Sequence, residues 1–192
     1  MSWVHRQLKS TRHERRVLLI ATKLFNLTMR LHDLGHRELR LLRFAALVHD
    51  VGRRFGEKNH PADGARMIED ESSLPLPMSQ RRIVCYLTRY HRGAVPKLGH
   101  DGILKKRDGR STCRKLLALL RAADSLDSRQ LSSPAISIAL RGRELLITCF
   151  VEPGCAKSRR IFARRKKFNL LEDVLNCTVD VNARPVETVE HV

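Results

Sequence analysis

The sequence predicts a mainly α fold, with a helical bundle over residues 1–130 and a small β-β-α-β unit over residues 131–192 packed on it. Apolar residues recur at helical spacing through most of the first 130 residues. From Ile136 onward they alternate with polar or small residues, which is the pattern of a strand. Hydrophobic residues make up 42% of the 192, so the chain is long and apolar enough to bury a core.

Five helices are expected in the bundle. The first covers residues 13–32 and ends at Gly35, a residue type that commonly follows a helix end. The second covers residues 37–50, is apolar nearly all round and therefore central, and terminates at Gly52. A loop over residues 93–110 holds glycines, a proline and charges, which predicts an exposed segment. The remaining three helices are residues 61–70 with Pro61 in the first turn, Ser79 to about His91, and Ser111 or Thr112 to about Leu126.

The C-terminal unit is predicted from a change of period. Two alternating segments are separated by a turn at residues 141–143, and a segment with helical spacing follows them. The expected elements are strands at residues 136–140 and 145–151, a helix at 157–175 and a third strand at 177–181.

Composition limits the classes of function. Lys and Arg total 37 against 20 acidic residues, and the formal net charge of +17 favours a polyanionic partner, although general solubility would also explain it. Aromatic residues make up only 5%, and the chain has no helix-turn-helix, zinc-finger or aromatic RNA-reading motif. The net charge is therefore the only feature that would favour binding to nucleic acid, and we do not expect nucleic acid as a partner.

The sequence also indicates a compartment. No apolar run approaches the ~20 residues that a membrane span needs, and the N-terminal residues lack the apolar stretch of a signal peptide. The five cysteines are odd in number and no pair has C-x-x-C spacing, which favours reduced thiols. We therefore expect a cytoplasmic protein with no membrane partner.

Histidine and aspartate side chains are expected to gather at one end of the bundle. His49 and Asp50 end the second helix, and antiparallel packing of the first two helices brings His13 beside them. Asp124 lies on the apolar side of the fifth helix, where a carboxylate needs a cation or several hydrogen-bond donors. Imidazole and carboxylate suit a divalent metal ion, so the four residues form a candidate metal site.

The same residue types also fit roles without a metal ion. His60 begins the third helix and His91 closes the fourth at the same end of the bundle, but each alone is more typical of a helix terminus. Asp124 could cap a helix or form a salt bridge in place of binding metal. The basic residues available for that salt bridge are Arg121, Arg89 and Arg53.

Three stretches give the chain a family resemblance: AALVHDVGR at residues 45–53, RYHRGAVPK at 89–97 and LRAADSLD at 120–127. With His13 they resemble the HD phosphohydrolase superfamily. More narrowly, the chain is similar to the C-terminal HD domain of the exopolyphosphatase / guanosine pentaphosphate phosphatase (Ppx/GppA) family. The resemblance covers nearly the whole chain and implies an HD-domain helical bundle followed by the β-β-α-β unit.

The resemblance also implies residue roles. His60 and His91 would be catalytic, because they could hold a second ion or donate to phosphate. The four core ligands of the superfamily are intact and would bind a divalent ion, which could be Mn, Mg, Co, Ni or Fe. Those ligands are His13, His49, Asp50 and Asp124.

Two departures from the family limit what is carried over. The family commonly has a histidine-rich run after the His-Asp helix, where this chain keeps His60 but has Asp63 at the later position. The family's N-terminal actin-like ATPase module, which carries polyphosphate hydrolysis, is not among these residues. That activity is therefore not implied, and a separate actin-like catalytic chain and a second copy of this chain are candidate partners.

The function indicated is a metal-dependent phosphohydrolase that acts on a phosphate ester or anhydride, such as a nucleotide or a polyphosphate-like compound. The alternative is a non-catalytic accessory module that binds polyphosphate or a guanine nucleotide, so whether the domain is an enzyme stays open. Basic residues beside the metal ligands are expected to bind substrate phosphate. These residues are Arg53, Arg54, Lys58, Arg92 and Lys97.

A second basic group lies on the predicted tail helix. It fits a polyanion-binding module and equally fits a solvated helix face. We expect it to lie apart from the metal site, so that only a long polyphosphate could reach both. The group consists of Arg159, Arg160, Arg164, Arg165, Lys166 and Lys167.

Overall fold

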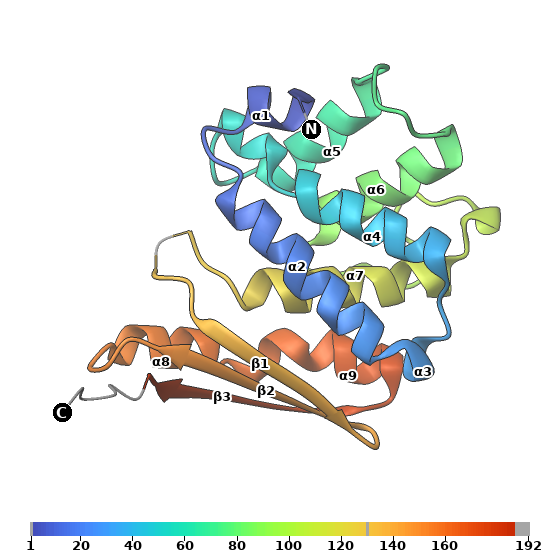
Figure 1. Cartoon of the computed structure of the whole chain (residues 1–192). Coiled ribbons are helices and arrows are strands. Elements are labelled where there is room, and N and C mark those ends of the chain that lie inside the picture. The colour runs from blue at the N-terminus through green and yellow to red at the C-terminus, as the bar shows by residue number, and fades with distance from the viewer. Residues whose placement is uncertain (1, 130, 187–192) are drawn as a thin grey trace.

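A helical bundle packs on a small three-stranded sheet (Figure 1). The structure is a computed structural model that describes residues 2–129 and 131–186. The bundle elements are α1 (Ser2–Gln7), α2 (Arg12–Leu27), α3 (Met29–His32), α4 (His36–Val48), the 3-10 turn η1 (Val51–Phe55), α5 (His60–Asp70), α6 (Met78–Tyr90), the 3-10 turn η2 (Lys106–Asp108) and α7 (Arg110–Ser125).

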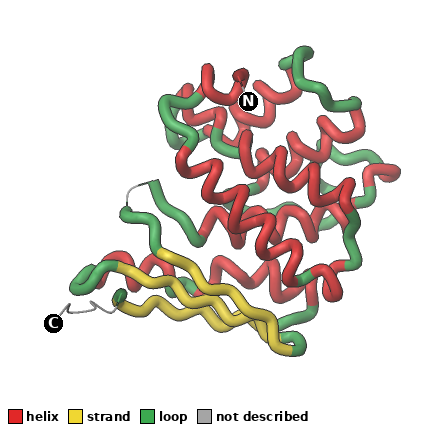
Figure 2. Tube along the Cα trace, viewed as in Figure 1, coloured by secondary structure: helices red, strands yellow, loops and turns green. Residues whose placement is uncertain are grey.

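The sheet has the strand order β1-β2-β3. β1 pairs antiparallel with β2, so that Ile138 lies opposite Ile147, and β3 pairs parallel with β2. Figure 2 shows the sheet along one edge of the molecule, with the helices gathered on one side of it. The elements of this part are β1 (Ala135–Arg141), β2 (Glu144–Val151), α8 (Ala156–Phe162), the 3-10 turn η3 (Arg165–Phe168), α9 (Asn169–Leu175) and β3 (Thr178–Pro185).

One apolar core joins the two parts. α4 is central, as its sequence predicted, because it packs on α2, α6 and α7 and buries apolar side chains along its length. α9 and η3 pack on α7, and β1 packs on α2. Buried residues from both parts, such as Leu116 of α7, Leu145 of β2 and Leu171 of α9, belong to one hydrophobic cluster. The mainly α fold with a small C-terminal sheet is therefore confirmed.

The predicted tail helix over residues 157–175 is wrong as a single element. The chain forms α8, turns at Arg164 in an extended conformation, and continues as η3 and α9. Phe162 and Phe168 explain the break, because both side chains are almost fully buried. In one continuous helix they would point about 120° apart, and both could not face the core.

Smaller corrections concern helix ends and one loop. The first predicted helix breaks at Thr28 into α2 and α3, and α6 and α7 begin after Pro77 and Gly109, earlier than the expected serine or threonine caps. The loop over residues 93–110 is only partly exposed. Asp108 is buried there because it accepts two hydrogen bonds from Arg82, both at 2.8 Å.

Within the described residues, every helix is too short or too polar to cross a membrane. All five cysteines lie in this part of the chain and carry free thiols.

Candidate metal centre

Six histidine and aspartate side chains meet where α2, α4, α5, α6 and α7 converge. Each one lies at or next to a helix end, and none is more than 8% exposed. The structure thus brings together all the residues that the sequence proposed as metal ligands or catalytic groups, although their roles stay predictions. The six are His13, His49, Asp50, His60, His91 and Asp124.

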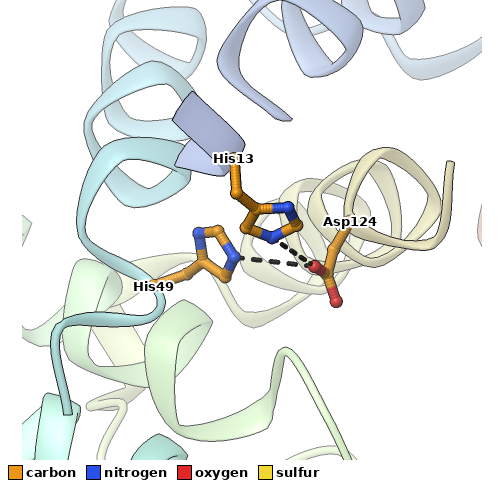
Figure 3. Close-up of side chains that lie close together, drawn as sticks. All are labelled: His13, His49 and Asp124. Atoms are coloured by element: carbon orange, nitrogen blue, oxygen red, sulfur yellow. Dashed lines mark hydrogen bonds and ion pairs between the residues drawn. The ribbon is translucent and has the colours of Figure 1, made fainter. Parts of the chain in front are cut away.

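His13 and His49 both direct a ring nitrogen toward one oxygen of Asp124 (Figure 3). Its Oδ1 atom is 3.1 Å from His13 Nε2 and 3.6 Å from His49 Nε2. The three ligand atoms lie within 4.8 Å of one another, close enough to share one ion. They come from α2, from the end of α4 and from α7, so the fold assembles this group from distant segments.

Asp50 lies between the remaining histidines. Its Oδ1 atom is 3.1 Å from His60 Nε2, 3.3 Å from His91 Nε2 and 3.8 Å from His49 Nε2. Its Oδ2 atom is 3.9 Å from His13 Nε2. Asp50 could therefore contact one ion on the side of His13 and another on the side of His60 and His91. His49 lies close to both positions.

Hydrogen bonds from the main chain fix the direction of three rings. The Nδ1 atoms of His49, His60 and His91 lie 2.9, 2.6 and 2.6 Å from the carbonyl oxygen three residues earlier. Donation by Nδ1–H leaves a neutral imidazole with the lone pair on Nε2. Each ring therefore presents Nε2 to the centre, and Nε2 is the atom that binds a metal ion when the ring is in this neutral form.

Two atoms at the centre are buried without any hydrogen bond: His49 Nε2 and Asp50 Oδ1. An unpaired buried nitrogen lone pair and carboxylate oxygen are costly, because neither can donate to the other. A divalent cation would satisfy both atoms at once. The donor set of imidazole nitrogens and carboxylate oxygens also suits a divalent transition metal, so the residues fit such an ion.

The pKa shifts of Asp50, Asp124 and His91 favour metal binding, and that of His49 opposes it. Burial alone would raise the pKa of Asp50 and Asp124, but the nearby histidines outweigh it and hold both pKa values well below the usual range. Burial lowers the pKa of His91, which keeps this ring neutral. Burial also acts to lower the pKa of His49, but Asp50 and Asp124 raise it overall, so an arriving ion must displace a proton from this ring. Ionised carboxylates and deprotonated ring nitrogens are the forms that bind metal.

Asp127, which the sequence hypothesis did not include, orients His13. Its Oδ2 atom is 2.8 Å from His13 Nδ1, while its Oδ1 atom accepts hydrogen bonds from Arg16 Nε at 3.0 Å and Ser133 Oγ at 2.7 Å. Burial would raise the pKa of Asp127, but these donors lower it overall. The sequence contained one indication of this role. Asp127 follows Asp124 by about one helical turn, close to the apolar face of α7.

Replacing Asp127 with asparagine should weaken metal binding by about 10- to 100-fold, which is typical for a carboxylate that orients a ligating histidine. Calorimetric titration of Mn²⁺ into both proteins would measure this change. Asp173→Asn on the exposed side of α9 is a matched control and should bind as the wild type does. Equal affinities for all three proteins would show that Asp127 has only a structural role.

Glu14 and Arg129 form an ion pair that contacts Asp50, which the sequence did not predict. Glu14 is fully buried and pairs through Oε1 with Arg129, whose Nε donates to Asp50 Oδ2 at 3.0 Å. Arg53 Nε donates to the same oxygen at 2.6 Å. No pattern in the sequence indicated this arrangement, because an acidic residue in a first helical turn is usually solvated.

The centre opens into a basic pocket of about 630 Å³. Of the predicted phosphate-binding residues, Arg53 and Arg92 line it, and Lys58 lines a smaller pocket beside it. Arg54 and Lys97 line neither pocket, and Arg54 donates a hydrogen bond to Gln7 instead.

The predicted separation between metal site and tail cations is wrong. Three of the six tail cations line the same pocket as His13 and Asp124. They are Arg160, Arg164 and Lys167. The break between α8 and η3 lets this segment pack against α7, which no helical pattern in the sequence could indicate.

Comparison with known proteins agrees with this geometry. A family model described as Ppx/GppA phosphatase, domain III, matches residues 8–144. None of the curated proteins that were compared with the chain matches it. The matched range includes all six residues of the centre and covers well over half of the chain. The chain therefore belongs to the Ppx/GppA phosphatase domain III family.

Proposed function

We propose that the protein is a metal-dependent phosphohydrolase that acts on a phosphate ester or anhydride. The observation that carries this proposal is that two buried ligand atoms, His49 Nε2 and Asp50 Oδ1, lie beneath a basic pocket without a hydrogen-bond partner. Seven basic and three acidic side chains line that pocket, an excess that favours an anionic substrate. Membership of a phosphatase-related family supports the same class of chemistry.

The proposed cofactor is a divalent transition ion. Four imidazoles and two carboxylates favour Mn, Fe, Co or Ni over Mg, which prefers oxygen ligands and retained water. When bound, such an ion lowers the pKa of water and polarises a phosphoryl oxygen. The proposed ligands are His13, His49, Asp50 and Asp124, with His60 and His91 available for a second ion.

Residues of the chain then bind and orient the substrate. Arg92 is exposed and contacts Asp124 at 3.5 Å and Glu57 at 3.8 Å, distances too long for strong hydrogen bonds. Its guanidinium is thus available to a phosphate oxygen. Arg53 is held by Asp50 and Glu57, so it positions the carboxylate and adds positive charge to the pocket wall.

Metal-dependent release of phosphate tests the proposal. Purified protein, stripped and then reloaded with Mn²⁺, Fe²⁺, Co²⁺, Ni²⁺ or Mg²⁺, should hydrolyse at least one member of a panel of phosphate esters and anhydrides. Asp124→Asn should lose this activity, while Asp173→Asn should retain it. Activity that survives both a chelator and Asp124→Asn would contradict the proposed mechanism.

A non-catalytic binding module is the second candidate. The observation that favours it is the pair of guanidinium groups on Asp50 Oδ2, since Arg53 and Arg129 already neutralise a central ligand. Such a module would bind phosphate compounds with metal but release no phosphate from any of them. Tight binding without turnover across the panel would therefore favour this function.

A further inference from the structure

A cavity of about 700 Å³ lies at the end of the bundle opposite the metal centre. Its walls come from the beginnings of α4, α6 and α7 and from the turn η2. From this cavity α4 runs toward His49 and Asp50, and α7 runs toward Asp124 (Figure 1). A helix with the 13 residues of α4 is about 20 Å long. The cavity and the metal centre are therefore separate sites.

The acidic side chains that line this cavity are already paired. Asp108 accepts both hydrogen bonds from Arg82 and a third from the main-chain nitrogen of Lys105 at 2.8 Å. Glu38 accepts a hydrogen bond from the main-chain nitrogen of Gly35 at 3.1 Å. The two carboxylates therefore hold the walls of the cavity together, and Arg82 is committed to one of them.

The other cations of the cavity have no such partner. Arg37, Lys105 and Arg107 are exposed, and their side chains form no ion pair or hydrogen bond with any residue in 2–129 or 131–186. The half-buried hydroxyl groups of Ser79 and Thr112 also have no hydrogen-bond partner in that part of the chain. Guanidinium and ammonium groups beside hydroxyl donors suit the several oxygens of a phosphate group.

One side of the cavity is apolar. Leu41 and Ile83 line it from the hydrophobic core, and Met78 at the beginning of α6 is 66% exposed. A methionine side chain is flexible and adapts its shape to an apolar ligand group. The volume of about 700 Å³ also lies within the range of about 300–1,000 Å³ that is typical of small-molecule sites. The cavity therefore fits a small anion that carries an apolar group.

We propose that this cavity binds an organic phosphate, a small molecule in which one phosphate group is attached to an apolar portion. The phosphate contacts the three unpaired cations, and the apolar portion lies against Met78. The proposal does not rest on metal chemistry, because none of the proposed metal ligands lines the cavity. It gives the protein a ligand site that can be filled while the metal centre is occupied.

Phenylphosphonate is the probe for this site, because it has both an anionic and an apolar part and resists hydrolysis. NMR of isotope-labelled methionine methyl groups would locate its binding in the full chain, which has four methionines, in the presence of a chelator. The signal of Met78, assigned with M78L, should shift and saturate as the probe is added. The signal of Met29, which is 52% exposed but lies outside the cavity, should not shift.

The test variant R37Q/K105Q/R107Q removes the unpaired cations and should weaken the affinity measured at Met78 by about tenfold or more. The matched control R40Q/R43Q/K106Q removes the same charges from exposed positions on α4 and η2 that do not line the cavity. Its affinity should change by less than about threefold, because salt screens distant exposed charges. Methylphosphonate, which lacks the phenyl group, should bind the wild type at least about fivefold more weakly.

Three results would overturn the proposal. A Met78 signal that moves without saturating would mean that the cavity holds no defined site. Equal losses of affinity in the test and control variants would mean that only net charge attracts the probe. Equal affinities for phenylphosphonate and methylphosphonate would mean that the apolar side takes no part in binding. Failure of the proposed function would leave all these measurements unchanged, since they are made without metal.

Discussion

Replacing Asp50 with alanine is expected to abolish metal binding and any phosphate release. Asp50 Oδ1 lies within 3.8 Å of three histidine Nε2 atoms, and its Oδ2 atom faces His13. Among the described residues, Asp50 is the carboxylate that approaches both His13 and the pair of His60 and His91. The variant therefore loses a negative charge that both sides of the centre share. Titration with Mn²⁺ and metal analysis of the purified variant would measure the loss, which should exceed the effect of Asp127→Asn.

The same substitution should destabilise the metal-free protein. Arg53 and Arg129 both pair with Asp50 and would lose a buried anionic partner. Arg53 and Arg129 keep Glu57 and Glu14 as partners, but each loses a charge-assisted hydrogen bond to Asp50, and such a bond contributes about 1.5–3 kcal/mol. Thermal unfolding of metal-free Asp50→Ala and Asp50→Asn would measure this effect, with Asp173→Ala as the control. A variant that kept full Mn²⁺ affinity would contradict the assignment of Asp50 as a ligand.

Replacing Gly52 with alanine is expected to have the second largest effect, on stability and on the metal centre together. A Cβ atom at this position would lie 2.1 Å from the carbonyl oxygen of His60 and 2.4 Å from the main-chain nitrogen of Gly64. Both neighbours are main-chain atoms, so η1 and α5 must move apart. Overpacking of this kind costs about 3 kcal/mol. His60 begins α5, so the movement would also carry its ring away from Asp50.

Two other glycines provide a graded control for Gly52→Ala. None of the three has a positive φ, so alanine is compatible with the backbone conformation at each position. A Cβ atom at Gly64 would meet Thr88 Cγ2 at 3.1 Å, and one at Gly35 would meet only Glu38 Oε2 at 3.5 Å. Melting temperatures should fall most for Gly52→Ala and less for the other two, since losing a good N-cap residue at Gly35 costs about 1 kcal/mol and alanine gains helix propensity at Gly64 within α5. Equal melting temperatures for the variants at Gly52 and Gly35 would contradict the close approach.

The helix ends explain how much of the centre the sequence could predict. His49 and Asp50 close a strongly apolar helix, and its antiparallel partner begins next to His13, so helical periodicity and short connections were enough to place them together. Asp124 was identifiable because a carboxylate on an apolar helix face requires a partner. These signals depend only on helix ends, helix faces and short connections, all of which can be read from nearby residues.

The contacts of Glu14, Arg129 and Asp127 could not be predicted in the same way. They depend on how the chain after α7 folds back onto α2, which joins residues more than 100 positions apart. The turn between α8 and η3 could not be predicted from the sequence for a related reason. The apolar spacing of residues 157–175 fits one helix, and only packing against α7 and the sheet selects the broken form.

The main-chain hydrogen bonds of His49, His60 and His91 have a thermodynamic consequence. Each ring is already locked by the helix end that carries it, so an arriving ion need not immobilise freely rotating side chains. Ordering a rotamer-rich side chain costs about 0.5–1.5 kcal/mol, and a preorganised site avoids most of that cost. Affinity for the ion then reflects mainly the chemistry of the ligands, because little side-chain ordering is left to oppose binding.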